Sequence, residues 1–221
     1  MRDRSCLLLA AAIALAPAVA LAAGGAYLVD DALIDDAGKC KVESWASAAA
    51  NRDFNAVTAP ACVVKLGIPV ELGGQLQRAR ADGVWSTSGM LRAKANLIPV
   101  ENHPFGLGIS GGSSWDLATG ANTGGFINVP VTFQVNDKLR INVNGGWLYD
   151  NAAKIHYATW GARFEWNFVK PLTLIGEVYG QAGSLPAADP GAPPAPRAIV
   201  EPRTQLGVRF TPQDNIDIDL I

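Results

Sequence analysis

The 221-residue sequence has few charged residues, two histidines and three cysteines. Charged residues make up 17% of the sequence, whereas about 25% is usual for soluble domains. This low share indicates that part of the surface does not face water. The 18 basic and 20 acidic residues leave no cationic excess. We therefore expect no nucleic-acid partner, because nucleic-acid binding needs a basic patch.

Recognisable catalytic patterns are also lacking. His103 and His156 have no serine or orienting carboxylate beside them in a known arrangement, and the cysteines are too few for a metal site. Gly106–Gly111 matches a dinucleotide fingerprint and Gly108–Gly112 a nucleophile elbow, but both motifs need a strand that turns into a helix. Here the strand pattern continues through both. We predict no enzyme activity, catalytic residue, cofactor or metal.

Long hydrophobic runs are absent except at the N-terminus. After Arg2 and Arg4, an uncharged run extends from Cys6 to Ala22 and contains Pro17. This pattern predicts a secretory signal peptide over residues 1–22, too short for a membrane span. Residues 23–39 are expected to be an acidic, solvated periplasmic lead-in, because the aspartates lack the spacing of a calcium loop; they are Asp30, Asp31, Asp35 and Asp36.

Two cysteines, Cys40 and Cys62, remain after removal of the signal peptide. An even pair in an exported chain predicts a disulfide, here closing a loop of about 22 residues. Removing the signal peptide also leaves 16 basic and 19 acidic residues, a net charge of about −3.

A two-residue hydrophobic period dominates the rest of the chain. In Gly124–Asn151, apolar residues from Ile127 to Tyr149 alternate with mostly polar ones, interrupted by the turn 136–138. The same period recurs from Trp85 to Leu220, and no helical stripe competes with it. The sequence predicts an all-β, up-and-down antiparallel domain over residues 40–221 with about eleven strands, the first near Lys41–Ala48, and a bulge at Pro130.

Short and long connections are expected to alternate, as in a barrel with one periplasmic rim and one outward rim. The short connections are 67–69, 101–104, 136–138, 169–171 and 212–215, and the longer ones are 79–84, 118–124, 150–155 and 183–202.

The alternation does not reveal which solvent the apolar face meets. Phe105 and Trp115 lie ten residues apart on one face, about 33 Å, which a 45° tilt projects to about 23 Å, close to the ~25 Å apolar band of outer-membrane barrels. The opposite face is rich in Gly, Asn, Ser and Gln, not in the Lys and Glu of a water-facing surface. We predict a transmembrane barrel in the cell outer membrane, with membrane lipid as partner and an aromatic girdle of Phe105, Trp115, Phe133, Trp147, Tyr149, Trp166 and Phe168.

Charged and amide side chains on the polar face would then line the lumen. They can pair across strands and plug the barrel, or line a polar path, and both readings stay open. The candidates are Arg92, Lys94, Arg140, Asn142, Asn144, Arg163, Glu165, Glu177, Arg203 and Arg209.

Three stretches carry a family resemblance: Lys65–Gln75, Trp147–Tyr149 and Leu206–Pro212. With them, the chain resembles the outer-membrane proteins grouped with the meta-pathway of phenol degradation. The resemblance implies a barrel of about twelve strands that admits small, often hydrophobic or aromatic, solutes. Such barrels end on an aromatic residue, whereas this sequence stops at Ile221, so we expect either that a closing strand is missing or that the barrel closes imperfectly. The predicted function is a passive channel or uptake protein, or a structural barrel with a plugged lumen; the alternative is a secreted soluble barrel that carries a lipid or apolar ligand.

Overall fold

A computed structural model describes residues 26–184, 197–213 and 216–221, so the predicted signal peptide lies outside the described residues. The alternating segments form strands because each has one face to bury and one to expose. Eleven strands follow in chain order: β1 Cys40–Ala48, β2 Phe54–Leu66, β3 Ile68–Ala81, β4 Val84–Ile98, β5 Gly106–Asp116, β6 Asn122–Asn136, β7 Leu139–Asp150, β8 Ile155–Val169, β9 Leu172–Ser184, β10 Arg197–Gln213 and β11 Ile216–Leu220. A single 3-10 turn, η1 Val100–Asn102, interrupts the described strands.

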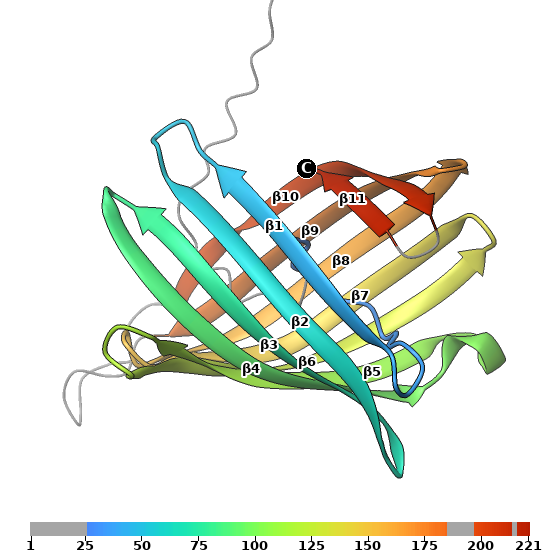
Figure 1. Cartoon of the computed structure of the whole chain (residues 1–221), viewed down its shortest axis with the longest axis horizontal. Coiled ribbons are helices and arrows are strands. Elements are labelled where there is room, and N and C mark those ends of the chain that lie inside the picture. Colours follow the sequence, from blue (N-terminus) through green and yellow to red (C-terminus); the bar gives the residue numbers. More distant parts are fainter. Residues whose placement is uncertain (1–25, 185–196, 214–215) are drawn as a thin grey trace, which may run out of the picture.

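The strands form one antiparallel sheet in which each strand pairs with the next in sequence, from β1 to β11. Figure 1 shows the long tilted strands curling around a central space, so that the sheet forms an incomplete barrel. In the sheet that the structure describes, β1 and β11 are not paired with each other. The predicted all-β, up-and-down fold and the strand number are confirmed. No described helix is long and apolar enough to cross a membrane.

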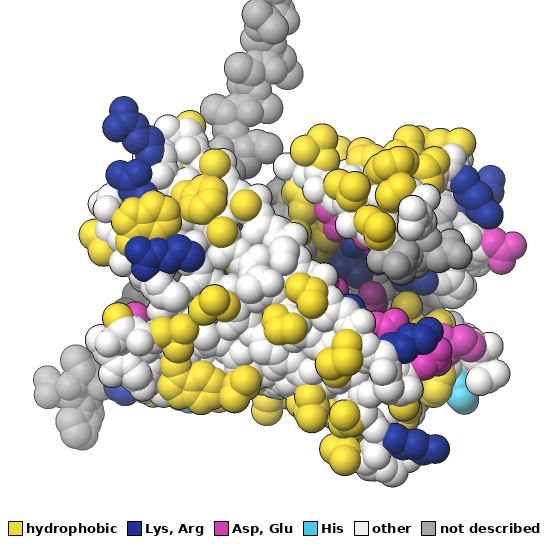
Figure 2. Space-filling view, viewed as in Figure 1, with side chains coloured by type: hydrophobic (Ala, Val, Ile, Leu, Met, Phe, Trp, Pro, Cys, Tyr) yellow, Lys and Arg dark blue, Asp and Glu magenta, His cyan; other side chains and the backbone are white. Residues whose placement is uncertain are grey.

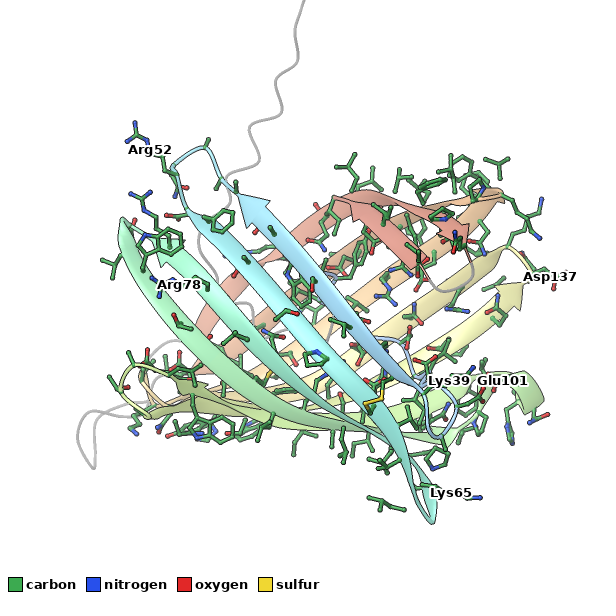
Figure 3. The ribbon with its side chains drawn as sticks, viewed as in Figure 1. Lys39, Arg52, Lys65, Arg78, Glu101 and Asp137 are labelled. Atoms are coloured by element: carbon green, nitrogen blue, oxygen red, sulfur yellow. A yellow bond between two sulfur atoms is a disulfide. The ribbon has the colours of Figure 1, made fainter. Side chains whose placement is uncertain are left out.

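The connections lie at two opposite rims. Rim 1 carries residues 49–53, 82–83, 117–121 and 151–154, and rim 2 carries residues 67, 99–105, 137–138 and 170–171. Figure 3 shows Arg52 at rim 1, and Lys65, Glu101 and Asp137 toward rim 2. The expected alternation of lengths is not strict, because 82–83 is a two-residue turn, whereas 99–105 includes η1.

Pro130 does not cause the predicted bulge. It pairs in register with Asn144 on β7, and the ladder to β5 skips Val129 and Pro130 and resumes without a shift. The β5–β6 ladder is interrupted next to Pro130, which has no N–H to donate, but the side chains of β6 keep their alternation between the two faces. The proline ring is fully buried, and it fills the space left by the absent side chain of Gly108.

The two faces of the curled sheet differ in polarity. Large apolar side chains stand exposed on the convex face, among them Leu91, Ile127, Val143 and Trp166. The concave face buries polar and charged side chains, among them Thr132, Asn142 and Glu177. Strand β2 is an exception, because its buried residues Val57, Ala59, Ala61 and Val63 are apolar. Apart from β2 and a few buried apolar residues on other strands, such as Phe126 and Leu148, the concave face is polar, which is the reverse of the arrangement in a soluble protein.

The predicted disulfide is confirmed. Cys40 and Cys62 are direct partners in the β1–β2 ladder and are covalently joined. The bond ties the start of β1 to its neighbour at the edge of the sheet.

Candidate functional site: the lumen and the segment that fills it

Residues 26–33, here called the lumen segment, lie on the concave side of the sheet. Tyr27, Val29 and Ala32 are 2%, 1% and 0% exposed. Figure 1 shows the blue stretch before β1 within the curve of the sheet. The prediction of a solvated lead-in is therefore wrong for this part of residues 23–39, although Asp35 and Asp36 are exposed. The strands around the segment, which form the wall of the curled sheet, supply its binding partners, and no local sequence pattern predicts these contacts.

Wall side chains bind the main chain of the lumen segment. The two carboxylate oxygens of Glu177 accept hydrogen bonds from the N–H groups of Leu28 and Val29 at 2.9 and 3.0 Å. Thr132 Oγ1 accepts a hydrogen bond from the N–H of Ala32 at 2.8 Å. Buried N–H groups need partners, and here strand side chains replace the neighbouring strand that would normally supply them.

Asn144 completes this set by pairing with Asp30 twice. Its Oδ1 accepts the N–H of Asp30 at 2.8 Å, and its Nδ2 donates to the Asp30 carbonyl oxygen at 2.7 Å. Asn128 Nδ2 also donates to Asn144 Oδ1, at 2.9 Å, which orients the amide. The segment is thus held in one register against β6, β7 and β9.

Ion pairs hold the two aspartates of the segment. Lys94 Nζ lies 2.8 Å from Asp30 Oδ1 and 3.2 Å from Asp31 Oδ1. Arg163 Nη2 lies 3.5 Å from Asp31 Oδ2 and 2.7 Å from Glu165 Oε1. Lys94, Arg163, Asp30 and Glu165 are buried and Asp31 is partly exposed, so the buried charges depend on their partners for solvation.

The two aspartates, which lie outside the strands, titrate differently. Burial raises the pKa of Asp30 despite the nearby Lys94. Burial also acts to raise the pKa of Asp31, but Lys94 and Arg163 outweigh it and hold that pKa below its ordinary value. The segment therefore carries an ionised carboxylate at Asp31, clamped by two cations.

Glycines in the wall make room for the segment. A Cβ atom at Gly161 would lie 2.5 Å from Val29 Cγ2, and one at Gly207 would lie 2.5 Å from the Tyr27 hydroxyl. A Cβ atom at Gly108 would lie 3.3 Å from the Cα of Ala32. A methyl group at Gly161 or Gly207 could not be accommodated without a shift, so these glycines define the groove in which the segment lies.

The predicted lumen residues divide into two groups. Six are buried, and each of them either contacts the segment or contacts a wall residue that does: Lys94, Asn142, Asn144, Arg163, Glu165 and Glu177. Asn142 does not touch the segment but links Thr132 to Glu165 through two hydrogen bonds, at 2.8 and 2.9 Å.

Three of the other predicted lumen residues act on the segment through their charges: Arg92 on Asp30, Arg140 on Asp31 and Arg209 on Tyr27. The fourth, Arg203, shares its strand face with Gln205, which donates to the Ala26 carbonyl oxygen at 3.3 Å. Arg92 pairs with the buried Glu71 at 3.1 Å. Arg140 and Arg209 stand near rim 2. There they help to line a cavity of about 190 Å³; the other lining residues, which are polar as well, are Gln134, Glu165, Asn167, Thr173, Thr211 and Asp217. We call this cavity the rim-2 vestibule.

An apolar cluster closes the concave side nearer rim 1. Met90, Phe126 and Leu148 are buried together, and Tyr157 packs against them. Phe126 and Leu148, with Pro130, are the apolar exceptions on an otherwise polar face of the sequence. These exceptions were the available signal for this cluster. No such signal marked the segment residues Tyr27 and Val29.

The aromatic residues predicted as a girdle form groups near both rims. Phe105 packs with Phe133 and Trp166 with Phe168 near rim 2, with ring centroids 6.3 and 5.9 Å apart. Near rim 1, Trp147 stacks on Tyr149 at 6.3 Å, and both contact the His156 ring. Trp115 stands at the rim-1 end of β5. Sequence reasoning missed a further rim-1 pair, Phe54 with Trp85, whose centroids lie 6.2 Å apart.

Within the described residues, no group of three or more His, Cys, Asp and Glu side chains is arranged to hold a metal ion. No curated protein and no solved structure matches the chain. One family model does match, that of the "Uncharacterised conserved protein UCP029691", and the match covers residues 11–221. Because the match extends over nearly the whole sequence, the chain belongs to this family.

Proposed function

We propose that the protein is an outer-membrane β-barrel that acts as a channel for small solutes and is closed, in the state described above, by its own lumen segment. The observation that carries the proposal is the polarity of the two faces. Exposed Leu, Ile, Val, Phe and Trp side chains cover the convex face, whereas charges and amides are buried on the concave face. In water, such a surface would cost about 25 cal/mol for each Å² of exposed apolar area, and hydrocarbon removes this cost.

The aromatic groups near both rims support the same proposal, because aromatic girdles mark the two interfaces of outer-membrane barrels. Figure 2 shows apolar side chains spread over the outer surface of the curled sheet and charged ones in the hollow beside it. A secreted carrier of lipid or apolar ligands would need the opposite arrangement, with an apolar cavity and a charged exterior.

The character of the lumen favours polar solutes. Eight polar side chains line the rim-2 vestibule, and ion pairs surround the lumen segment. The hydrophobic or aromatic solutes implied by the phenol-pathway resemblance would match the apolar cluster of Met90, Phe126 and Leu148, but they would also have to pass the polar rim-2 vestibule and the ion pairs. We therefore propose small hydrophilic or charged solutes, with passage only after the lumen segment has moved.

Fractionation and electrophoresis test the membrane part of the proposal. We expect the protein in the detergent-extracted outer membrane, with a band that migrates differently before and after boiling. Recovery as a soluble periplasmic protein would contradict the proposal.

Planar-bilayer recording tests the channel part. The intact protein should show little or no current, whereas a variant that lacks residues 26–33 should conduct. A control variant with Gln134→Leu, which alters the rim-2 vestibule but does not contact the segment, should stay closed. A deletion variant that shows the boiling-dependent shift of a folded barrel yet carries no current would overturn the channel proposal and leave a structural barrel.

A further inference from the structure

Two arginines stand on the convex face of β3 close to rim 1. Arg78 and Arg80 alternate with Gln77 and Ala79 and share the face of the exposed Leu72 and Leu76. Among the convex-face strand positions whose side chains are described, only these two carry charged side chains. A lipid-facing surface excludes charge at its centre but accepts arginine near the interface, so their place at the end of the strand is informative.

The two arginines lie beside an aromatic pair. Arg80 is the ladder partner of Phe54 on β2 and of Trp85 on β4, so the three side chains form a row across three strands. Trp85 and Phe54 are 46% and 37% exposed. The Cζ atom of Arg78 lies 5.0 Å from the centroid of the Trp85 ring. Figure 2 shows basic side chains next to apolar ones over this end of the sheet. We call Arg78, Arg80, Phe54 and Trp85 the rim-1 patch.

In the part of the chain that the structure describes, no carboxylate neutralises the charge of Arg78 or Arg80. Asp53 and Asp82 lie in the adjoining turns, but Asp53 accepts hydrogen bonds from the Asn51 side chain and from the main-chain N–H of Asp82. None of the ion pairs found among the described residues involves Arg78 or Arg80. Arg78 donates one hydrogen bond, to Thr87 Oγ1, and Nε of Arg80 is buried without a hydrogen-bond partner in the described ranges.

We propose that the rim-1 patch binds the phosphate groups of a phosphorylated glycolipid in the outer leaflet, an inference that rests on the proposed membrane function. Guanidinium groups bind phosphate through paired hydrogen bonds, and Trp85 lies where indole rings favour the boundary between headgroup and acyl chain. Residues two apart on a strand are about 7 Å apart, so the two arginines can hold two phosphates or grip one from both sides. Outer-membrane barrels have short turns at the periplasmic rim and longer connections at the outer rim. Strand β9 ends and β10 begins at rim 1, with 12 residues between them in the sequence, so we take rim 1 to face outward.

The test compares three proteins in two kinds of vesicle. The intact protein, Arg78→Gln/Arg80→Gln and the control Lys65→Gln are mixed with phosphatidylcholine vesicles, with and without a bisphosphorylated glycolipid such as lipid A. Lys65 is an exposed cation at the opposite rim, so its loss changes net charge without touching the patch. Flotation reports insertion, and mass spectrometry of the protein extracted in mild detergent reports retained glycolipid.

We expect all three proteins to float with both vesicles. The double variant should bind the glycolipid about 30-fold more weakly, from about 1 kcal/mol for each arginine, and Lys65→Gln should bind it as the intact protein does. Arg78→Lys/Arg80→Lys should restore part of the binding, because lysine keeps the charge but not the paired hydrogen bonds.

Three results would overturn the inference. Equal retention by the intact protein and the double variant would show that the patch does not bind the lipid. An equal loss in Lys65→Gln would show a non-specific charge effect, and displacement of the glycolipid by millimolar inorganic phosphate would show that the site takes free phosphate. Failure of the intact protein to float with either vesicle would sink the proposed function itself, whereas flotation of the intact protein without retained glycolipid would sink only this inference.

Discussion

The side chain of Asn144 binds the main chain of Asp30 as a neighbouring β-strand would. The amide accepts from the N–H of Asp30 at 2.8 Å and donates to its carbonyl oxygen at 2.7 Å, although the two residues are 114 positions apart. A side-chain amide carries the same donor and acceptor as a peptide group. The wall of the barrel therefore offers the lumen segment a substitute for a strand partner, and removal of this pair should weaken the closure of the lumen.

Asn144→Leu should release the lumen segment. The substitution leaves the N–H and the carbonyl group of Asp30 buried without partners, at about 1–3 kcal/mol each. Hydrogen exchange measures the result directly: the amides of Leu28–Ala32 should exchange at least about tenfold faster than in the intact protein. Gln134→Leu is the matched control, since it removes an amide that does not contact the segment. Unchanged exchange in Asn144→Leu would contradict the assigned role.

Gly161→Ala should expel the segment by a steric clash. The new Cβ atom would lie 2.5 Å from Val29 Cγ2, in a strand that otherwise favours alanine over glycine. We expect an open channel in planar bilayers and faster proteolysis within residues 26–33. The second substitution Val29→Ala removes the clashing methyl group, so the double variant should close again. If the double variant stays as open as Gly161→Ala, the contact is not the cause.

Lys94→Met should free the segment without unfolding the barrel. Loss of one partner of a buried ion pair costs about 3–5 kcal/mol, but undocking limits the loss to the free energy with which the segment binds. Burial already raises the pKa of Asp30, and loss of the Lys94 charge raises it further. Docking should therefore recover as the pH falls and Asp30 becomes protonated. Conductance from pH 7 to pH 4 measures this, and a current that grows with acidity would contradict the account.

The Cys40–Cys62 disulfide should stabilise the edge of the sheet. Its loop of about 22 residues corresponds to about 3 kcal/mol through the unfolded state. Cys40→Ser/Cys62→Ser should lower the urea concentration at half unfolding, measured by the boiling-dependent band shift. The conductance of the closed barrel should not change, because both cysteines are exposed and neither is among the residues that bind the lumen segment. An unchanged midpoint would show that the bond adds no stability.

The strands could be predicted from the sequence because their signal is local. The two-residue period of residues such as Ile127, Val129 and Val131 places them on one face whatever lies around them. The period does not reveal whether that face turns outward. The direction was indicated by other features: the low share of charged residues, the spacing of Phe105 and Trp115, and the amides that stand in place of many lysines and glutamates on the polar face.

The lumen segment could not be predicted in the same way. Tyr27 and Val29 sit among acidic residues in a stretch too short for a periodic pattern, and Asp30 and Asp31 resemble a solvated turn. Their partners Asn144, Glu177 and Lys94 lie far away in the sequence, so only the curled sheet brings them together. The glycines opposite the segment, such as Gly161, also resemble ordinary small residues within strands.

The account depends on the apolar convex face meeting hydrocarbon. Nitroxide labels on single cysteines at Val129 and Val143, both exposed on the convex face, and at Gln134 and Thr173, both in the rim-2 vestibule, test this in lipid vesicles. Collision rates with oxygen, which concentrates in hydrocarbon, should be high at Val129 and Val143, and those with a water-soluble nickel chelate should be high at Gln134 and Thr173. The opposite pattern, with the chelate reaching Val129 and Val143, would contradict the membrane assignment and the channel proposal together.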